Sequence, residues 1–188
     1  MSTAGPGLVI AIVGAESTGK STLAVALAGA LCRAGHDAVA VGEHLRDFCD
    51  RTGRTPRADE QRAVADQQTR RIELAASAHA IVVADTTALM TAVYSDLVFG
   101  DTSLYPLAEA EQARYALTLL TALDLAWQAD GLQRDGAHVR VPVDAKLRAA
   151  LARSGVEPAI VSGHGDARLE SALDALRRVP LRPRRPSA

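Results

Sequence analysis

Short apolar runs alternate along the chain with longer segments of mixed polarity, which predicts strands that alternate with helices. Five short apolar runs have the composition of strands buried on both faces, and they lie at 8–13, 38–41, 80–85, 115–121 and 158–162. The segments between them carry apolar residues at helical spacing, which predicts helices at 22–33, about 42–51, 58–78, 86–94, 109–113, 143–153 and 167–178. Residues 95–110, with Gly100, Asp101 and Pro106, predict an irregular loop.

This alternation indicates an α/β domain built in three layers. Strands that alternate with helices form right-handed βαβ units, so we expect a five-stranded parallel sheet with helices on both faces. We expect the domain to span residues 8–178, with a flexible leader at 1–7 and a disordered tail at 179–188 that is rich in arginine and proline. Because such sheets bind ligands at the carboxyl ends of their strands, residues at strand ends are the candidates for function.

The composition disfavours several classes of partner. The chain of 188 residues is 48% hydrophobic and 23% charged and has a formal net charge of −1, so no overall field attracts nucleic acid or an anionic membrane. It shows no signal-peptide pattern and no apolar run of membrane-spanning length, and its only cysteines are Cys32 and Cys49. We therefore expect a cytoplasmic protein with reduced thiols, whose oligomeric state the sequence does not indicate.

The strongest chemical signal follows the first predicted strand. The run Gly14-Ala15-Glu16-Ser17-Thr18-Gly19-Lys20-Ser21, followed by Thr22, matches the P-loop pattern G-x-x-x-x-G-K-[ST] at every fixed position. Its glycines allow backbone N–H groups to surround phosphates, Lys20 can reach the β- and γ-phosphates, and the Ser21 hydroxyl can bind Mg²⁺. An ordinary glycine turn is the alternative, and the strand and helix on either side favour nucleotide binding.

Two acidic residues at strand ends suit a phosphotransfer site. Asp85 ends the third strand in the Walker B position, where it could hold Mg²⁺ opposite Ser21, and it could also cap the next helix. Glu43 follows the second strand and is our first candidate for the base that takes a proton from an acceptor hydroxyl, with Asp85 second. Arg46 could hold the substrate or the transferring phosphoryl group, or form a surface ion pair with Glu43.

A polar, glycine-containing stretch at about 124–140 predicts a mobile lid. It contains the only tryptophan, Trp127, which could stack on an aromatic ring or cover the edge of the core. Arg134 would suit a lid arginine that neutralises charge on the γ-phosphate. On the long predicted helix, Gln68 and Arg71 could contact an acceptor or belong to a solvated face.

Together these motifs resemble one family of kinases. The P-loop resembles the G-x-E-S-[ST]-G-K-S form of the ribosylnicotinamide kinase domain of NadR-type proteins and their stand-alone relatives, often labelled AAA-type ATPases. Glu43-His44-Leu45-Arg46 resembles the family's E-x-x-R, and Asp85-Thr86 resembles its D-T at the Walker B strand. Asp124-x-x-Trp127-x-x-Asp130-Gly131-x-x-Arg134 resembles the lid segment of the family, and Gln68 falls where the family carries a glutamine. The resemblance spans about residues 8–178.

The resemblance implies a P-loop kinase that uses ATP and Mg²⁺ to phosphorylate nicotinamide riboside to nicotinamide mononucleotide. It further implies that Trp127 stacks near the nicotinamide ring, and that Asp124 or Asp130 binds ribose hydroxyls or the lid arginine. No counterpart of the regulator's DNA-binding and adenylyltransferase domains is present, so we expect no regulation through DNA. Two alternatives are a kinase for another nucleoside or nucleotide and a nucleotide-dependent switch ATPase. The absence of an N-K-x-D guanine motif disfavours a GTP-binding switch.

Overall fold

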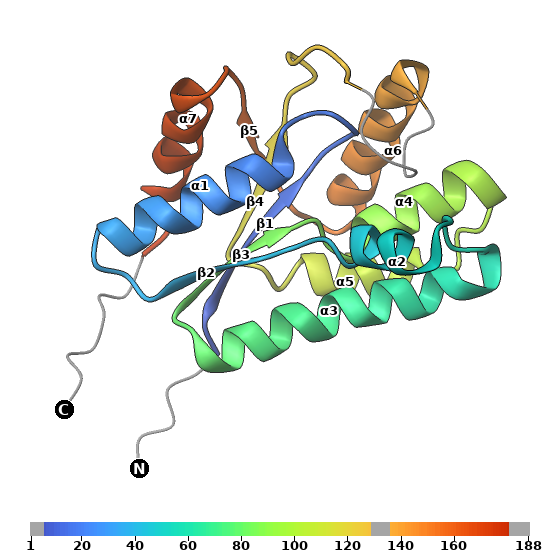
Figure 1. The fold of residues 1–188 in the computed structure, drawn as a ribbon, viewed down its shortest axis with the longest axis horizontal. Coiled ribbons are helices and arrows are strands. Elements are labelled where there is room, and N and C mark those ends of the chain that lie inside the picture. Colours follow the sequence, from blue (N-terminus) through green and yellow to red (C-terminus); the bar gives the residue numbers. More distant parts are fainter. Residues whose placement is uncertain (1–5, 129–135, 181–188) are drawn as a thin grey trace.

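A parallel sheet forms the frame of the molecule. The computed structural model describes residues 6–128 and 136–180, and its five strands pair in the order β2-β3-β1-β4-β5 (Figure 1). The strands are β1 (Leu8–Val13), β2 (Ala38–Val41), β3 (Ile81–Asp85), β4 (Leu117–Thr121) and β5 (Ala159–Val161). Every pairing is parallel, which confirms the predicted α/β fold with a five-stranded parallel sheet.

The strand β1 lies at the centre of the sheet, where the direction in which strands are added reverses. The strands β2 and β3 lie on one side of β1, and the chain then crosses over to build β4 and β5 on the other side. Near its carboxyl end, β1 places Ile12 in register with Asp85 of β3 and with Leu119 of β4. The residues that follow β1, β3 and β4 therefore meet at one edge, where sheets of this kind bind their ligands.

Helices cover both faces of the sheet and complete three layers (Figure 1). One face is covered by α1 (Lys20–Arg33) and α7 (Asp166–Leu176). The other face is covered by α3 (Gln61–Ala78), α4 (Ala88–Phe99), α5 (Tyr105–Gln112) and α6 (Arg140–Arg153). The helix α2 (His44–Thr52) packs beside α3, and two short 3-10 turns lie at Ala58–Glu60 and Ala137–Val139.

The core occupies both faces because neighbouring residues of a strand point to opposite sides of the sheet. In β1, Ile10 and Ile12 pack with residues of α1 and α7, whereas Val13 packs with residues of α4, α5 and α6. Leu119 and Leu120 in β4 divide between the same two clusters. Burial on both faces explains why these strands appear in the sequence as continuous apolar runs.

The loop predicted at residues 95–110 is wrong. The helix α4 continues to Phe99 and ends at Gly100, which has a positive φ of 68° and closes the helix as a left-handed cap. A second helix, α5, begins at Tyr105, and Pro106 lies in its first turn, where its missing N–H breaks no helical hydrogen bond. The glycine and the proline therefore mark two helix ends and not a long irregular segment.

The start of α6 also lies earlier than predicted, since the helix begins at Arg140 and includes Pro142 in its first turn. At the other end of the chain, the Gly7 N–H donates to the carbonyl of Ala76 (2.7 Å), so Gly7 already belongs to the folded domain. Residues 1–5 of the predicted leader and residues 181–188 of the predicted tail lie outside the described residues. Among the helices that the structure describes, none is long and apolar enough to span a membrane.

Candidate nucleotide and acceptor site

The P-loop adopts a backbone conformation with several positive φ angles. Gly14 has a φ of 152° and Gly19 a φ of 74°, and Ser17, which is not glycine, has a φ of 52°. Residues in this region of φ and ψ place successive N–H groups in concave arrangements that bind anions. The helix α1 begins at Lys20, so its positive dipole end lies directly after the loop.

The loop is fixed to the end of β4. Thr18 Oγ1 donates to the carbonyl of Ala15 (2.8 Å) and lies 2.7 Å from Thr121 Oγ1. A Cβ atom on Gly14 would come within 2.0 Å of Thr121 Oγ1, so this close approach requires glycine. Lys20 Nζ donates to the Ala15 carbonyl (2.8 Å), which places the ammonium group against the loop. The geometry is that of a formed phosphate-binding loop.

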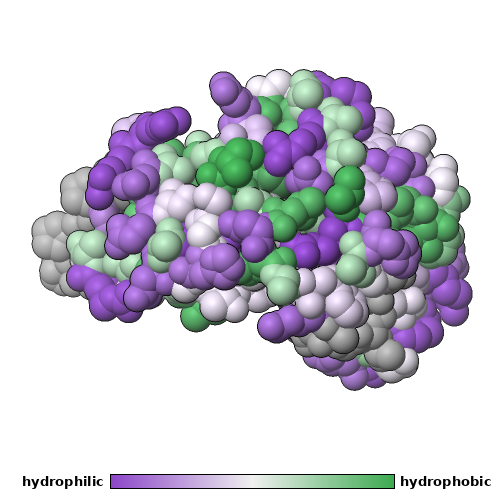
Figure 2. All heavy atoms as spheres, turned by 90° about the horizontal axis from the view of Figure 1, so that it is seen from above, coloured by the Kyte–Doolittle hydropathy of each residue, from purple (hydrophilic) through white to green (hydrophobic). Residues whose placement is uncertain are grey.

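A cleft of about 470 Å³ opens beside the loop and joins it to the end of β2. It is lined by P-loop residues and by residues from α2, α4 and the segment after β4: Glu16, Ser17, Thr18, Gly19, Lys20, Ser21, Thr22, Glu43, Leu45, Arg46, Thr86, Met90, Tyr94, Ala126 and Gln128. The lining mixes charged and apolar side chains. The surface seen from above in Figure 2 is likewise mixed, with hydrophilic residues over much of it and separate hydrophobic patches between them.

The lining of the cleft carries charges of both signs. Its cations are Lys20 and Arg46, and its carboxylates are Glu16 of the P-loop and Glu43. The ring of Tyr94 also lines the cleft, and its hydroxyl is 3.4 Å from Glu16 Oε1. Glu16 is only 6% exposed.

Asp85 lies at the carboxyl end of β3, and its environment suits a metal ligand. The residue is 4% exposed, and its Oδ1 has no hydrogen-bond partner among the described residues. A buried carboxylate oxygen without a donor is unfavourable unless a cation or water satisfies it. The alternative role as a helix cap is wrong, because Thr87 caps α4 and its side chain accepts from the Leu89 N–H. Asp85 and Ser21 therefore fit Mg²⁺ by their chemistry.

Gln68 is buried and does not belong to a solvated face. It is 2% exposed, and its Oε1 accepts from the backbone N–H of His44 (2.7 Å). Its Nε2 lies 3.4 Å from the carbonyls of Gly42 and Thr86. Arg71, considered with it in the sequence, instead forms an ion pair with Asp47 of α2. Gln68 thus contacts the backbone on both sides of Glu43, which lines the cleft.

His44, the first residue of α2, is also buried. Burial lowers the pKa of its imidazole, and the positive charges of Arg71 and Arg51 lower it further, while Asp47 opposes them. A cationic His44 is therefore disfavoured beside Glu43.

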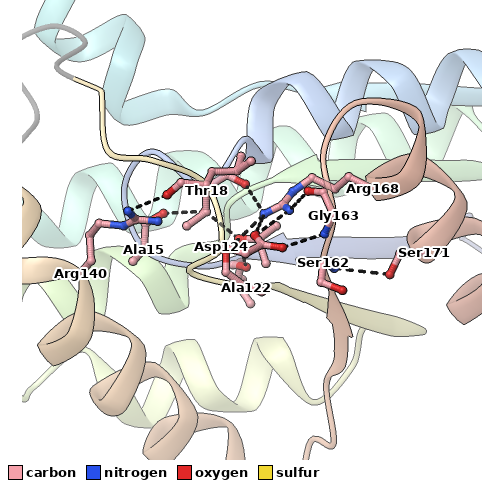
Figure 3. Close-up of polar contacts among 12 residues, drawn as sticks. Ala15, Thr18, Ala122, Asp124, Arg140, Ser162, Gly163, Arg168 and Ser171 are labelled. Atoms are coloured by element: carbon pink, nitrogen blue, oxygen red, sulfur yellow. Dashed lines mark hydrogen bonds and ion pairs between the residues drawn. The ribbon is translucent and has the colours of Figure 1, made fainter.

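The carboxylate of Asp124 is bound by other residues of the chain (Figure 3). Its carboxylate forms an ion pair with Arg168 (Nη1–Oδ1 2.9 Å) and accepts from the Gly163 N–H (2.7 Å). Arg168 is 4% exposed and also donates to the carbonyls of Thr18 and Ala122. Burial lowers the pKa of Arg168, and the charge of Asp124 raises it. No motif singles out this arginine, since it lies within an ordinary helical pattern.

The remaining predicted residues lie around the segment that follows β4. Trp127 is half-buried, and its indole Nε1 has no hydrogen-bond partner among the described residues. Arg140, which no sequence pattern singled out for the site, is 8% exposed and donates from Nη1 to the Leu125 carbonyl (2.9 Å) (Figure 3). The predicted ligands Asp130 and Arg134 lie outside the described residues.

Comparison with a family model decides the family. The model of the AAA domain matches residues 9–168, which is most of the chain. The chain belongs to the AAA domain family. No curated protein sequence matches this AAA domain.

Solved structures define the fold of this AAA domain more closely. A NadR protein in complex with NR (nicotinamide riboside) superposes with a TM-score of 0.76 at 23% identity, over 97% of this chain and 54% of the NadR chain. A NadR protein in complex with NAD and AMP-PNP gives 0.74 at 22% identity, over 96% and 52%. Thymidylate kinase from Ehrlichia chaffeensis gives 0.63 at 14% identity, over 92% and 99%.

The AAA domain thus has a P-loop kinase fold, and the predicted resemblance to NadR-type proteins is confirmed in its fold. The chain spans about half of the length of the NadR chains that it matches.

Proposed function

We propose that the protein is an ATP-dependent small-molecule kinase that phosphorylates nicotinamide riboside to nicotinamide mononucleotide. One observation carries the proposal: a single cleft joins the P-loop to Glu43 and Arg46 at the end of β2. A donor phosphate on the loop and an acceptor beside Glu43 would share one cleft, as transfer between two substrates requires. The NadR structures, which hold NR in one case and AMP-PNP in another, support this choice of acceptor and donor.

The carboxylates of the cleft support the riboside over a nucleotide. Glu16, Glu43 and the ring of Tyr94 line the cleft, and its cations, Lys20 and Arg46, are assigned in this proposal to the transferred phosphate. Two carboxylates and an aromatic ring attract a cation, and the nicotinamide ring of the riboside carries a positive charge. A nucleoside monophosphate would bring two negative charges toward the same carboxylates. We therefore expect discrimination in favour of an acceptor that has a cationic ring and no phosphate.

In the proposed mechanism, the residues of this chain position the donor and move one proton. The loop amides and Lys20 hold the phosphates, and Ser21 and Asp85 would hold Mg²⁺. When bound, the metal supplies neutralisation of phosphate charge. Glu43 takes the proton of the 5′-hydroxyl as that oxygen bonds to the γ-phosphorus, while the bond from the γ-phosphorus to the β,γ-bridging oxygen breaks and ADP leaves. Arg46 stabilises the charge on the transferring group, with Arg134 as the proposed lid arginine.

The segment after β4 would complete the acceptor site. Ala126 and Gln128 line the cleft and Trp127 between them does not, so the indole would stack on the nicotinamide ring only after a shift of this segment. Asp130 remains a proposed ligand of the ribose hydroxyls. For Asp124, proposed as a second such ligand, the ion pair with Arg168 favours a supporting role at the loop of Gly163.

A panel of acceptors tests the proposal. Purified protein with Mg–ATP is assayed for ADP release and for the phosphorylated product with nicotinamide riboside, common nucleosides, and nucleoside monophosphates including thymidine monophosphate. We expect a kcat/KM for the riboside at least about 100-fold above that for any monophosphate. A difference of this size is expected when the phosphate of a monophosphate meets a carboxylate in a poorly solvated site. Turnover of a monophosphate without turnover of the riboside would instead favour the thymidylate kinase relationship.

A further inference from the structure

The residues 124–128, here called the Trp127 strap, lie against the P-loop and are held at three points. At its start, Asp124 is held by Arg168 and Gly163. In its middle, the carbonyl of Leu125 accepts from Arg140, and a Cβ atom on Gly19 would lie 3.1 Å from Leu125 Cδ1. At its end, Gln128 is bonded to Ser17 of the P-loop. Figure 3 shows the first of these attachments around Asp124.

The attachment between Ser17 and Gln128 uses both hydrogen-bonding functions of one hydroxyl. Ser17 Oγ donates to the Gln128 carbonyl (2.7 Å) and accepts from the Gln128 N–H (3.2 Å). Both contacts reach the backbone of Gln128, so they fix the path of the strap and not the rotamer of one side chain. Because Gln128 follows Trp127 directly, the same contacts limit the movement of the tryptophan.

The serine is not required by phosphate binding itself. Position 17 is one of the variable positions of the P-loop pattern, which any residue can occupy. Its φ of 52° is moreover a left-handed conformation that favours glycine over serine. A serine at a position where glycine would fit the backbone better points to a role for its hydroxyl.

We infer that Ser17 is a positioning residue that couples the P-loop to Trp127. A nucleotide on the loop adjusts the loop backbone at Ser17, and the two hydrogen bonds carry that adjustment to the strap. Coupling of this kind is reciprocal, so an acceptor that contacts Trp127 would in turn favour nucleotide binding. Only this consequence for the acceptor rests on the proposed function, whereas the contact between loop and strap does not.

The only tryptophan of the chain makes the coupling measurable. Trp127 fluorescence and its quenching by acrylamide are compared in the wild type, Ser17→Gly, Ser17→Ala and Ser77→Ala. Glycine relieves the left-handed backbone and alanine retains its strain, so an effect shared by both variants belongs to the hydroxyl. Ser77, whose hydroxyl donates to the Leu74 carbonyl on α3, is the matched control.

We expect both Ser17 variants to raise the quenching constant of Trp127 by about twofold or more, because the strap loses two hydrogen bonds. We also expect Mg–AMP-PNP to change Trp127 fluorescence in the wild type and in Ser77→Ala. In Ser17→Gly the nucleotide should still bind, as calorimetry would show, but the fluorescence change should fall below about half of the wild-type value. The KM for the riboside should rise about 3- to 10-fold.

Unchanged quenching and an unchanged nucleotide response in Ser17→Gly would overturn the inference. The two proposals fail separately. If no riboside turnover occurs but Ser17→Gly and Ser17→Ala release Trp127, the proposed substrate is wrong and the coupling stands. If the riboside is phosphorylated and both Ser17 variants retain wild-type quenching, nucleotide response and riboside KM, the kinase stands and the coupling is wrong.

Discussion

At the scale of single residues, burial separates the roles of the two carboxylates at the strand ends. Asp85 is buried with an oxygen that lacks a partner among the described residues, which suits a cation. Glu43 lines the open cleft beside Arg46, where an acceptor hydroxyl could reach it. The same side-chain chemistry thus supports a metal ligand in one place and a general base in the other.

Replacing the proposed base should lower the rate of transfer without affecting the donor. For Glu43→Gln we expect kcat to fall by about 10²- to 10⁴-fold, because the amide cannot accept the proton, while the KM for ATP changes little. Steady-state kinetics with the best acceptor would measure both constants. Glu73→Gln, an exposed position on α3, is the control and should keep wild-type kinetics. A wild-type kcat in Glu43→Gln would transfer the role of base to Asp85.

At the scale of elements, α3 fixes the position of α2 relative to the sheet. The side chain of Gln68 joins the first N–H of α2 to the backbone at Gly42 and at Thr86, after β2 and β3. Thr86 has a positive φ of 68°, an unfavourable conformation for threonine that its surroundings must maintain. The glutamine therefore stabilises the backbone on which Glu43 and Asp85 are presented.

Removing this amide should destabilise the protein. Gln68→Leu keeps a side chain of similar size but leaves the buried His44 N–H without its acceptor, so we expect a loss of about 1–3 kcal/mol in the free energy of unfolding. Urea unfolding would measure it. Gln68→Glu retains the acceptor oxygen and should lose less. Gln67→Leu, at the neighbouring exposed position, is the control; a loss as large there would show that the effect is not due to the hydrogen bond.

At the scale of the whole molecule, the strand order brings distant parts of the chain to one edge. Arg168 in the first turn of α7 donates to the carbonyl of Thr18 in the P-loop, and Thr121 at the end of β4 contacts the Thr18 hydroxyl. The P-loop is therefore held by residues at the end of β4 and after β5, far from it in the sequence. Binding there should stabilise the complete domain and not one loop alone.

Nucleotide binding should be visible as a shift in the melting temperature. At a free Mg–AMP-PNP concentration of about 100 times Kd, binding contributes about 2.7 kcal/mol, which for a domain of this size corresponds to a rise in Tm of about 5–11 °C. Thermal unfolding followed by circular dichroism would measure it. Lys20→Ala and removal of Mg²⁺ with EDTA should each reduce the rise. Lys146→Ala should keep it; absence of any rise in the wild type would contradict nucleotide binding at the P-loop.

Local patterns were sufficient for the elements that depend on neighbouring residues. The β1 strand and the P-loop were predictable because burial on both faces produces a continuous apolar run, and because phosphate binding needs glycine, lysine and serine at fixed spacing. The predicted loop at 95–110 is wrong because Gly100 and Pro106 are as typical of two helix ends as of an irregular loop. Here the packing of both helices decided the outcome.

Periodicity and short-range spacing along the chain are enough to establish the α/β class, the parallel sheet and the phosphate loop. Which polar residues line the cleft and which hold other parts of the chain depends on the tertiary fold. Gln68 and Asp124 are bonded to other parts of the chain, and Arg140 and Arg168 reach the strap and the P-loop without any motif. Such partners lie far apart in sequence, and a side chain's hydrogen bonds depend on what the fold places within 3 Å of it.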